Sequence, residues 1–257
     1  MVLMAKRKKR IVNRVFKLLF VLGIAAAVTW YLTTVIFKPS FVHYPAFGID
    51  IPVNYTLHGI DVSRHQQTIS WADVKGMNVD NIKLDFVFIK ATEGLGNVDE
   101  QFRRNWLFAQ KQGITKGAYH FFIATKSGKL QAQNFIETVQ LQKGDLPPVL
   151  DIEQAYGASP QNLQQHVAEW LLAIEKKYRV LPIIYTNVDF YNRFLSGRFD
   201  DYPLWVAHYL VKDKPRIKRN WLFWQHSESG HVNGIEPYVD FNVFNGDSTA
   251  FEMLKIK

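Results

Sequence analysis

Two carboxylic acids stand two positions apart at the end of an apolar run in this sequence. Asp151 and Glu153 close a run that begins with the apolar residues 147–150. Side chains of a strand repeat every second residue, so both carboxyls are expected on the same side, about 7 Å apart along the chain. Two facing carboxyls do not readily both ionise, so one keeps its proton and can act as an acid. Glycoside hydrolysis uses such a pair of catalytic groups: one carboxyl protonates the leaving oxygen, and another stabilises or attacks the sugar carbon.

An Asp-x-Glu pattern alone is weak evidence, because two solvated acids at a surface strand end have the same spacing. Two further acids strengthen the interpretation. Asp61 is expected at the end of the first of eight predicted strands and Asp240 at the end of the last. First and last strands become neighbours when a barrel closes, so all four acids are expected at one mouth.

Aromatic side chains fall at the ends of the strands between these acids. Flat rings suit a groove in which sugars stack, and polar strand ends can add hydrogen bonds to the sugar hydroxyls. The candidate substrate-binding residues are Tyr119, Phe121, Tyr185, Trp205, Tyr209 and Gln225.

Other chemistries find little support in the sequence. The chain has no cysteine, which excludes thiolate zinc sites, iron–sulfur clusters and a cysteine nucleophile. Its eight histidines form no His-Glu-x-x-His pattern, and neither a Gly-x-Ser-x-Gly elbow nor a phosphate-loop glycine pattern occurs. We therefore expect no metal and no cofactor.

The elements that must position these residues alternate along the chain. Apolar, β-rich runs bounded by turn residues predict eight strands, and helical periods fall between the first five of them. A helix entered by Ser159 as cap and Pro160 as first helical residue has the strongest period, and a capping box is predicted at Ser70 and Asp73. A weaker helix is predicted over 190–195 and none after the sixth strand. The predicted strands are 57–62, 86–91, 117–122, 148–152, 182–186, 203–208, 221–225 and 239–244.

This alternation predicts an α/β fold in which right-handed crossovers join parallel strands. Eight strands in about 200 residues favour a closed barrel that is short for its type and irregular in its last third. An open doubly wound sheet is the alternative. Its phosphate-binding signal is incomplete, because Gly94 and Gly96 are not followed by the third glycine.

The basic charge of the chain is concentrated at its N-terminus. Of the net charge of +8, seven cations lie in residues 1–17, and residues 18–37 then carry no charge. A helix of that length spans roughly 30 Å, the thickness of a bilayer core. A cleavable signal peptide is the alternative, but the run is long and contains Trp30 and Tyr31, which are typical of an interfacial belt.

The predicted organisation has four parts. Residues 1–17 are a cytoplasmic basic segment, 18–37 a transmembrane anchor, 38–56 a linker with three prolines, and 57–257 the catalytic barrel. The sequence thus predicts a single-pass protein of the inner membrane with its catalytic part on the outer, periplasmic side. Outside residues 1–17 the charges nearly balance, so no nucleic-acid partner is expected.

Several separated motifs, in the same order, resemble glycoside hydrolase family 25, over about residues 57–244. These enzymes are lysozymes that cleave after N-acetylmuramic acid in peptidoglycan. The resemblance implies an irregular TIM-like (β/α)5(β)3 barrel. The motifs are His58-Gly-Ile-Asp-Val-Ser-Arg-His65-Gln66, Phe88-Ile-Lys-Ala-Thr-Glu-Gly94, Gly117-Ala-Tyr-His-Phe-Phe122, Pro148-Val-Leu-Asp-Ile-Glu153, Leu204-Trp-Val-Ala-His-Tyr209 and Val239-Asp-Phe-Asn-Val-Phe244.

The resemblance also implies roles for the acids. Glu153 matches the general acid, Asp151 the second carboxylate beside it, and Asp61 and Asp240 the remaining acids. Two mechanisms stay open: a retaining one, in which Asp151 orients the substrate's own acetamido group as nucleophile, and an inverting one with an activated water.

Two positions depart from the family pattern. His226 stands where tyrosine is usual, and Gln67 where glycine is common. Neither position carries one of the four acids, so the departures bear on substrate preference more than on activity.

The expected function is a membrane-tethered peptidoglycan hydrolase that cleaves the β-1,4 bond between N-acetylmuramic acid and N-acetylglucosamine. Its expected partners are peptidoglycan in the cell wall and the membrane, through residues 18–37, and the chain is expected to be a monomer. Two alternatives remain: a non-catalytic cell-wall-binding module, and a hydrolase of a chitin-like polymer.

Overall fold

The computed structural model describes residues 2–33, 39–211 and 213–257 and divides into two compact units, Met1–Ser40 and Phe41–Lys257. The first unit contains helix α1 (Val2–Tyr31). Its part Asn13–Tyr31, with a mean hydropathy of 1.5, is long and apolar enough to cross a membrane. The predicted anchor over 18–37 coincides with α1 as far as Tyr31, and its residues 34–37 lie outside the described part of the chain.

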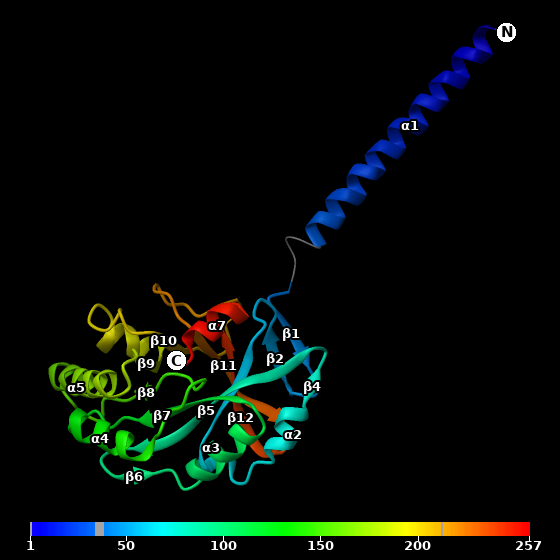
Figure 1. The fold of residues 1–257 in the computed structure, drawn as a ribbon. Coiled ribbons are helices and arrows are strands. Elements are labelled where there is room, and N and C mark those ends of the chain that lie inside the picture. Colours follow the sequence, from blue (N-terminus) through cyan, green and yellow to red (C-terminus); the bar gives the residue numbers. More distant parts are fainter. Residues whose placement is uncertain (1, 34–38, 212) are drawn as a thin grey trace. The chain divides into compact units, whose positions relative to one another are not determined.

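The second unit is built on a closed ring of eight strands, and each of the eight predicted strands is confirmed (Figure 1). The ring closes because the first strand pairs with both the second and the last. Short strands β4 (Asn78–Val79) and β6 (Asn97–Val98) flank the second strand of the ring. The ring consists of β3 (His58–Val62), β5 (Ile82–Glu93), β7 (Thr115–Phe121), β8 (Val149–Asp151), β9 (Ile183–Asn187), β10 (Leu204–Ala207), β11 (Phe223–Val232) and β12 (Ile235–Phe244).

The last strand runs against the others. β3, β5, β7, β8, β9, β10 and β11 are parallel, whereas β12 is antiparallel to both of its neighbours. Asp240 therefore lies within its strand and not at a carboxyl end, which corrects the expectation. It still reaches the same mouth, because the register pairs Asp240 with Asp61.

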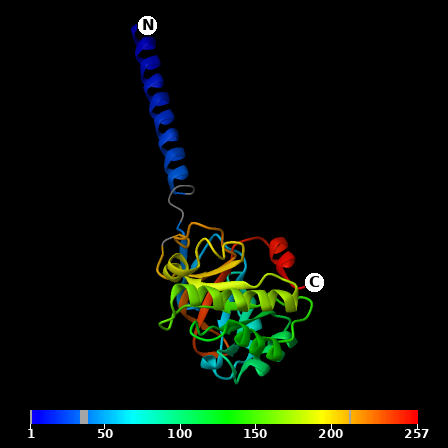
Figure 2. The same cartoon turned by 90° about the vertical axis from the view of Figure 1, so that its left-hand side faces the viewer.

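Helices cover the outside of the ring, and Figure 2 shows α5 lying across it. Ser159 accepts a hydrogen bond from the Asn162 backbone N–H and Pro160 opens the helix, as predicted. Ser70 makes no such bond, so that predicted cap is wrong; the capping box instead joins Ser63 and Gln66 around the short turn Arg64–Gln66. The helices are α2 (Trp71–Gly76), α3 (Phe102–Lys111), α4 (Gly128–Thr138), α5 (Pro160–Tyr178) and α6 (Val188–Phe190), which continues as a π-helical turn over Tyr191–Leu195.

A further helix, α7 (Ser248–Leu254), follows the last strand, where no helix was predicted. Its seven residues are too few to display a helical period. Its Phe251 ring lies 5.6 Å from Phe86 and 5.2 Å from Phe244, so α7 packs on the aromatic interior of the barrel.

The segment predicted as a linker is largely folded. Strands β1 (Phe41–Tyr44) and β2 (Ile49–Pro52) form an antiparallel hairpin. Phe47 is fully buried, with its ring 5.3 Å from Phe241 on β12. The compact unit therefore begins at Phe41 and not at residue 57, because this hairpin buries apolar side chains on the barrel.

Aromatic side chains fill the barrel interior, and glycines make room for them. Phe86 and Phe88 are fully buried. A Cβ atom on Gly59 would lie 2.4 Å from the Phe86 ring, and one on Gly117 would lie 2.6 Å from the Phe88 ring. These two strand glycines thus let large rings fill the space inside a narrow barrel.

We predict that Gly59→Ala lowers the free energy of unfolding by about 1–3 kcal/mol, the usual effect of overpacking a filled core. The added methyl group would meet both the Phe86 ring and its backbone oxygen, at 2.6 Å. Urea unfolding measures the effect. Gly76→Ala is the control, because nothing lies within 4 Å of its added Cβ; equal stability of the two variants would contradict the argument.

A buried ion pair supports the barrel wall away from the mouth. Lys116 and Asp145 are 3% and 4% exposed and form a salt bridge. The Lys116 ammonium also lies 4.3 Å from the centre of the Trp106 ring, and Asp145 accepts a hydrogen bond from the Gln142 backbone N–H at 2.8 Å. Both charges therefore have partners that offset their loss of water.

Candidate active site

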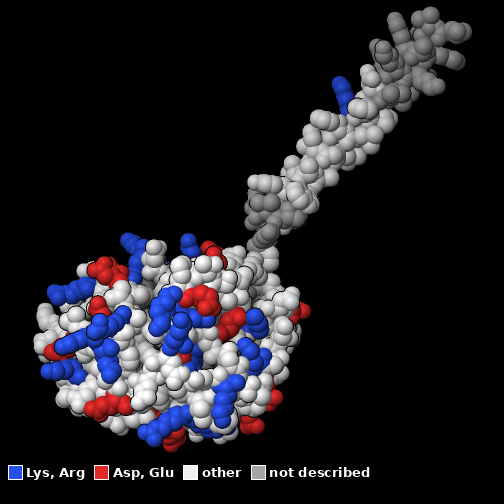
Figure 3. Space-filling model, viewed as in Figure 1, with Lys and Arg blue, Asp and Glu red and all other residues white. Residues whose placement is uncertain are grey.

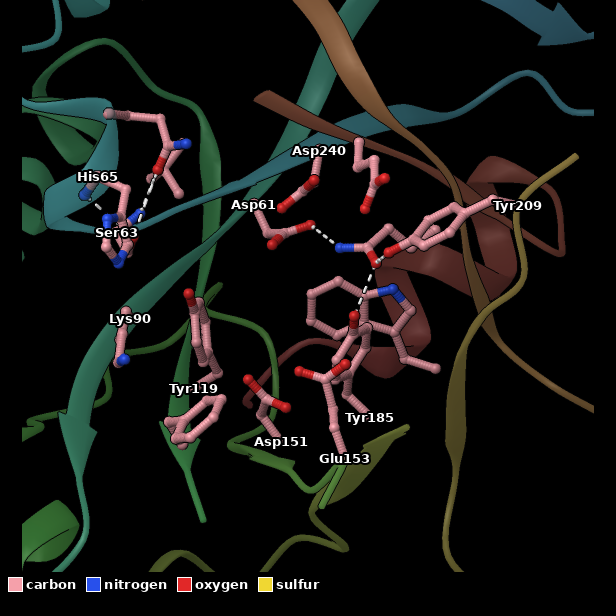
Figure 4. A pocket seen from close by; sticks show the side chains of 16 residues that line it. Asp61, Ser63, His65, Lys90, Tyr119, Asp151, Glu153, Tyr185, Tyr209 and Asp240 are labelled. Carbon is pink, nitrogen blue, oxygen red and sulfur yellow. Dashed lines mark hydrogen bonds between the residues drawn. The ribbon is translucent and has the colours of Figure 1, made fainter. Parts of the chain in front are cut away.

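A pocket of about 380 Å³ opens at the mouth of the barrel. Figure 4 shows the side chains of Asp61, Asp151, Glu153 and Asp240 around one common space. All ten residues predicted for the site line this pocket, although they come from seven strands or strand ends. They are Asp61, Asp151, Glu153, Asp240, Tyr119, Phe121, Tyr185, Trp205, Tyr209 and Gln225.

Asp61 is held by two side-chain amides. Its Oδ2 atom accepts hydrogen bonds from Gln225 Nε2 and from Asn242 Nδ2, both at 2.8 Å. Asp61 is 7% exposed, and hydrogen bonds in such a low-dielectric interior are stronger than in water. The two donors fix the carboxylate in one orientation.

Aromatic donors hold both amides in turn. The hydroxyl groups of Tyr185, at 2.7 Å, and of Tyr209 donate to Gln225 Oε1. The Trp205 indole N–H donates to Asn242 Oδ1 at 2.8 Å. Each amide oxygen accepts from a tyrosine hydroxyl or from the indole N–H. Each amide nitrogen is therefore left to face Asp61.

Asp61 and Asp240 share a proton. Burial raises the pKa of Asp61 to about 6, although the bonds from Asn242, Gln225 and Asp240 oppose the rise. Burial and the charge of Asp61 raise the pKa of Asp240 to about 9. Near neutral pH, Asp61 is therefore the anion and Asp240 holds the proton that bonds to it.

This assignment predicts that Asp240→Asn stabilises the fold at alkaline pH. Folded Asp240 keeps a proton that the unfolded chain releases near pH 4, so the stability of the wild type falls as pH rises toward about 9. The asparagine amide still donates a hydrogen bond but does not titrate, so it avoids the loss of stability at high pH. We expect the free energy of unfolding at pH 8 to rise by a value on the order of 2 kcal/mol. Urea unfolding at pH 5 and pH 8 measures it. A gain of the same size at both pH values would contradict the assignment.

Asp151 and Glu153 form the second pair. They extend from the end of β8, where the Phe122 N–H donates to the Asp151 carbonyl at 2.8 Å and the Ile152 N–H to the Tyr185 carbonyl at 3.0 Å. Burial, then the charges of Glu153 and Asp61, raise the pKa of Asp151 well above its ordinary value. Burial also raises the pKa of Glu153, against the effect of its hydrogen bond to Asp151. Both shifts favour a proton held by one of the two carboxyls.

One buried oxygen of this pair lacks a hydrogen-bond donor in the described part of the chain. Asp151 Oδ1 is buried and has no hydrogen-bond partner among the described residues. A buried oxygen of that kind is costly unless something donates to it. Asp151 also lines the pocket, so a ligand that binds there lies next to this carboxyl.

The predicted aromatic residues do not all present a free ring. Trp205 is 2% exposed, and its ring stacks on Phe88 with centroids 4.5 Å apart. Tyr185, 6% exposed, packs against the edge of Trp205. These two rings form the floor of the pocket and orient the amides, which leaves Tyr119, Phe121 and Tyr209 as the better platforms for sugar.

Several pocket residues were not among the predicted site residues. Asn242, a fully buried residue that holds Asp61 from behind the lining, was also not among them. It could have been found, because it lies two positions after Asp240 and so faces the same side of β12. Glu228 lies on β11 beyond the predicted end of that strand. The added lining residues are Val62, Ser63, His65, Gln66, Lys90 and Glu228, of which only Lys90 is a lysine or arginine.

The two departures from the family pattern lie outside the pocket lining. His226 is 6% exposed and packs against Trp224 and Phe241, and burial lowers its pKa to about 3. Gln67 has φ +53°, a conformation that favours glycine. Among the described residues, no group of three or more His, Asp or Glu side chains is arranged to hold a metal ion.

Comparisons with known proteins agree with this geometry. The profile of glycosyl hydrolases family 25 matches residues 60–235. YegX of Escherichia coli O6:H1 is 44% identical over 225 residues, which cover 85% of this chain and 83% of YegX. Lysozyme M1 of Streptomyces globisporus is 34% identical over 207 residues, covering 75% of this chain and 69% of the lysozyme.

Solved structures show the same fold. A family 25 glycosyl hydrolase from Bacillus anthracis superposes with a TM-score of 0.73 at 31% identity, covering 79% of this chain and 95% of that one. A bacterial lysozyme from Streptomyces coelicolor superposes with a TM-score of 0.69 at 33% identity, covering 77% and 96%. The chain belongs to glycosyl hydrolases family 25 and is a glycoside hydrolase.

Proposed function

We propose that this protein hydrolyses peptidoglycan at the β-1,4 bond between N-acetylmuramic acid and N-acetylglucosamine. The observation that carries the proposal is the meeting of four carboxyls, in two pairs, in one aromatic-lined pocket. Burial raises the pKa of each of the four. Similarity to lysozymes from two Streptomyces species supports the choice of substrate.

Glu153 is the proposed general acid. Burial raises its pKa, which favours the protonated form that a general acid needs, and its side chain lines the pocket where a substrate would bind. It donates that proton to the glycosidic oxygen while the bond from that oxygen to the muramic acid C1 breaks. Asp61, held as an anion by its two amides, stabilises positive charge that develops on the sugar ring.

Asp151 is the proposed orienting group. Its carboxyl lines the pocket and can accept the N–H of the substrate's acetamido group, whose oxygen then attacks C1 and forms a cyclic intermediate that water opens. In the inverting alternative, a carboxylate about 6.5–9.5 Å from the acid activates a water instead. The side-chain hydrogen bond between Asp151 and Glu153 leaves no such room between them, which favours the substrate-assisted route for this pair.

We predict that Lys90→Met moves the alkaline limb of the activity profile to higher pH. The Lys90 charge lowers the pKa of Asp151, so its loss lets the pair keep the shared proton to a higher pH. The measurement is kcat/KM on peptidoglycan fragments across pH, with Lys129→Met, an exposed lysine on α4, as control. A limb that moves to lower pH, or stays in place, would contradict the electrostatic account.

We further propose that α1 anchors the enzyme in the inner membrane as a single pass, with its N-terminus in the cytoplasm and its monomeric catalytic domain on the periplasmic side. The length and hydropathy of Asn13–Tyr31 and the cations that precede it support this topology.

New reducing ends provide the test of function. The full chain in detergent should release them from purified peptidoglycan and not from chitin. Binding without release would favour a non-catalytic cell-wall-binding module, and faster release from chitin would favour a chitin-like substrate. Either result would overturn the proposal.

A further inference from the structure

The segment between β10 and β11 carries an unusual share of positive charge. Residues 210–220, here called the basic segment, hold five Lys or Arg residues and one acid, Asp213. The rest of the unit Phe41–Lys257 holds 18 Lys and Arg and 22 Asp and Glu. The basic segment therefore carries a net positive charge, whereas the rest of the domain carries a net negative charge.

The fold holds the basic segment in place. Val211 and Pro215 are buried. The Arg219 guanidinium donates to the backbone oxygens of Phe199, at 3.2 Å, and Tyr202. The remaining described cations of the segment are all exposed. These are Lys214, Arg216 and Lys218.

These three cations have no ion-pair partner among the described residues, whereas Lys83, Lys90 and Lys255 each pair with an acid. Figure 3 shows Lys and Arg side chains protruding along the edge of the domain where Figure 1 draws this part of the chain in orange. Their field is thus available to an anionic surface outside the molecule.

The basic segment lies beside the point where the chain enters the domain. The Arg216 backbone N–H donates to the His208 ring at 3.1 Å, and the Trp224 indole donates to the His208 carbonyl at 2.9 Å. The Trp224 ring in turn packs edge-on against Phe41, with centroids 5.8 Å apart. Phe41 is the first residue of the domain.

Chain length limits how far this point can lie from α1. Helix α1 ends at Tyr31, and the residues between it and Phe41 span at most about 30 Å even when fully extended. If α1 crosses a membrane, the basic segment stays near the membrane surface at high effective concentration. An anionic polymer in solution would not have this advantage.

We propose that Lys214, Arg216 and Lys218 dock the catalytic domain on the anionic phospholipid headgroups of the membrane that α1 spans. The inference rests on the proposed tether and adds to it a second, electrostatic attachment. Each cation near such a surface strengthens attachment about fivefold, so the three together favour the docked state about a hundredfold at low salt.

The absence of cysteine makes the test direct, because a single introduced cysteine takes a unique label. The full chain carrying Asn220→Cys, with a donor dye, is reconstituted in vesicles that contain a headgroup-labelled acceptor lipid. Energy transfer should be at least about twofold higher with phosphatidylglycerol than with phosphatidylcholine alone. It should fall back in about 1 M salt, where the screening length is about 3 Å. A dye at Leu130→Cys on α4 should show neither change.

A charge-matched pair of variants separates docking from net charge. Lys214→Gln/Arg216→Gln/Lys218→Gln should abolish the gain in anionic vesicles and leave hydrolysis of soluble glycan fragments unchanged. The control Lys129→Gln/Lys143→Gln/Lys177→Gln removes three other exposed cations and should keep the gain.

Three results would overturn the proposal. Equal energy transfer in both lipids would exclude docking and leave the tether intact. If alkaline carbonate extracts the chain from the vesicles, the chain does not span the membrane, and the tether itself is refuted. A dye response to purified peptidoglycan in place of anionic vesicles would assign the basic segment to a cell-wall polymer.

Discussion

Glu153→Gln should lower the rate of reducing-end formation from peptidoglycan by about a thousandfold, the usual contribution of a general acid. The amide has nearly the same shape but no acidic proton to give to the glycosidic oxygen. Initial rates on purified peptidoglycan, measured together with binding to the same material, check the expectation. Binding should persist, because the lining of the pocket is otherwise unchanged.

The matched control is Glu228→Gln, which removes a carboxylate that lines the same pocket but belongs to neither of the two carboxyl pairs. Its rate should stay within about tenfold of the wild type. Full activity of Glu153→Gln, or an equal loss in the two variants, would refute the assignment of the acid.

Lys116→Met should lower the free energy of unfolding by about 3–5 kcal/mol, because it leaves the Asp145 carboxylate buried without its counter-charge. Asp145 is 4% exposed and the pair lies in the barrel wall, so water cannot replace the lost partner without opening the fold. Urea unfolding of the full chain at pH 7 measures the change.

The double variant Lys116→Met/Asp145→Asn separates lost charge from lost packing. It removes both charges and keeps an oxygen for the Gln142 backbone N–H. We expect it to recover most of the stability, since neutral replacements of buried pairs are often tolerated. A double variant as unstable as the single one would contradict the electrostatic explanation.

Much of the fold was predictable because each strand leaves a local signal. The eight apolar runs bounded by turn residues each became one strand of the ring. The reversed direction of β12 left no such signal, since a strand has the same side-chain period in either direction. Asp240 reaches the pocket through the register of β12 with β3, and not as a residue at a carboxyl end.

Two elements were missed because their patterns are short. Three prolines suggested a linker before the barrel, yet Phe47, Ile49 and Ile51 alternate with polar or exposed positions, as a half-buried strand requires. Helix α7 has only seven residues, too few to show a period.

The four acids and the lining aromatics were predictable from residue type at strand ends. Their mutual support was not. The bond from Tyr185 to Gln225 joins residues 40 positions apart, and the bond from Gln225 to Asp61 joins residues 164 apart. Only the closed barrel brings these residues together. The structure alone therefore shows that Trp205 and Tyr185 orient the two amides that hold Asp61.

If the enzyme hydrolyses the bond after N-acetylmuramic acid, the position of the new hydroxyl group in its products will show it. Mass spectrometry of products formed from purified peptidoglycan in heavy-oxygen water measures this position. We expect fragments that end in a reducing N-acetylmuramic acid carrying one heavy oxygen at C1. Fragments that end in a reducing N-acetylglucosamine, or that gain no heavy oxygen, would contradict this expectation.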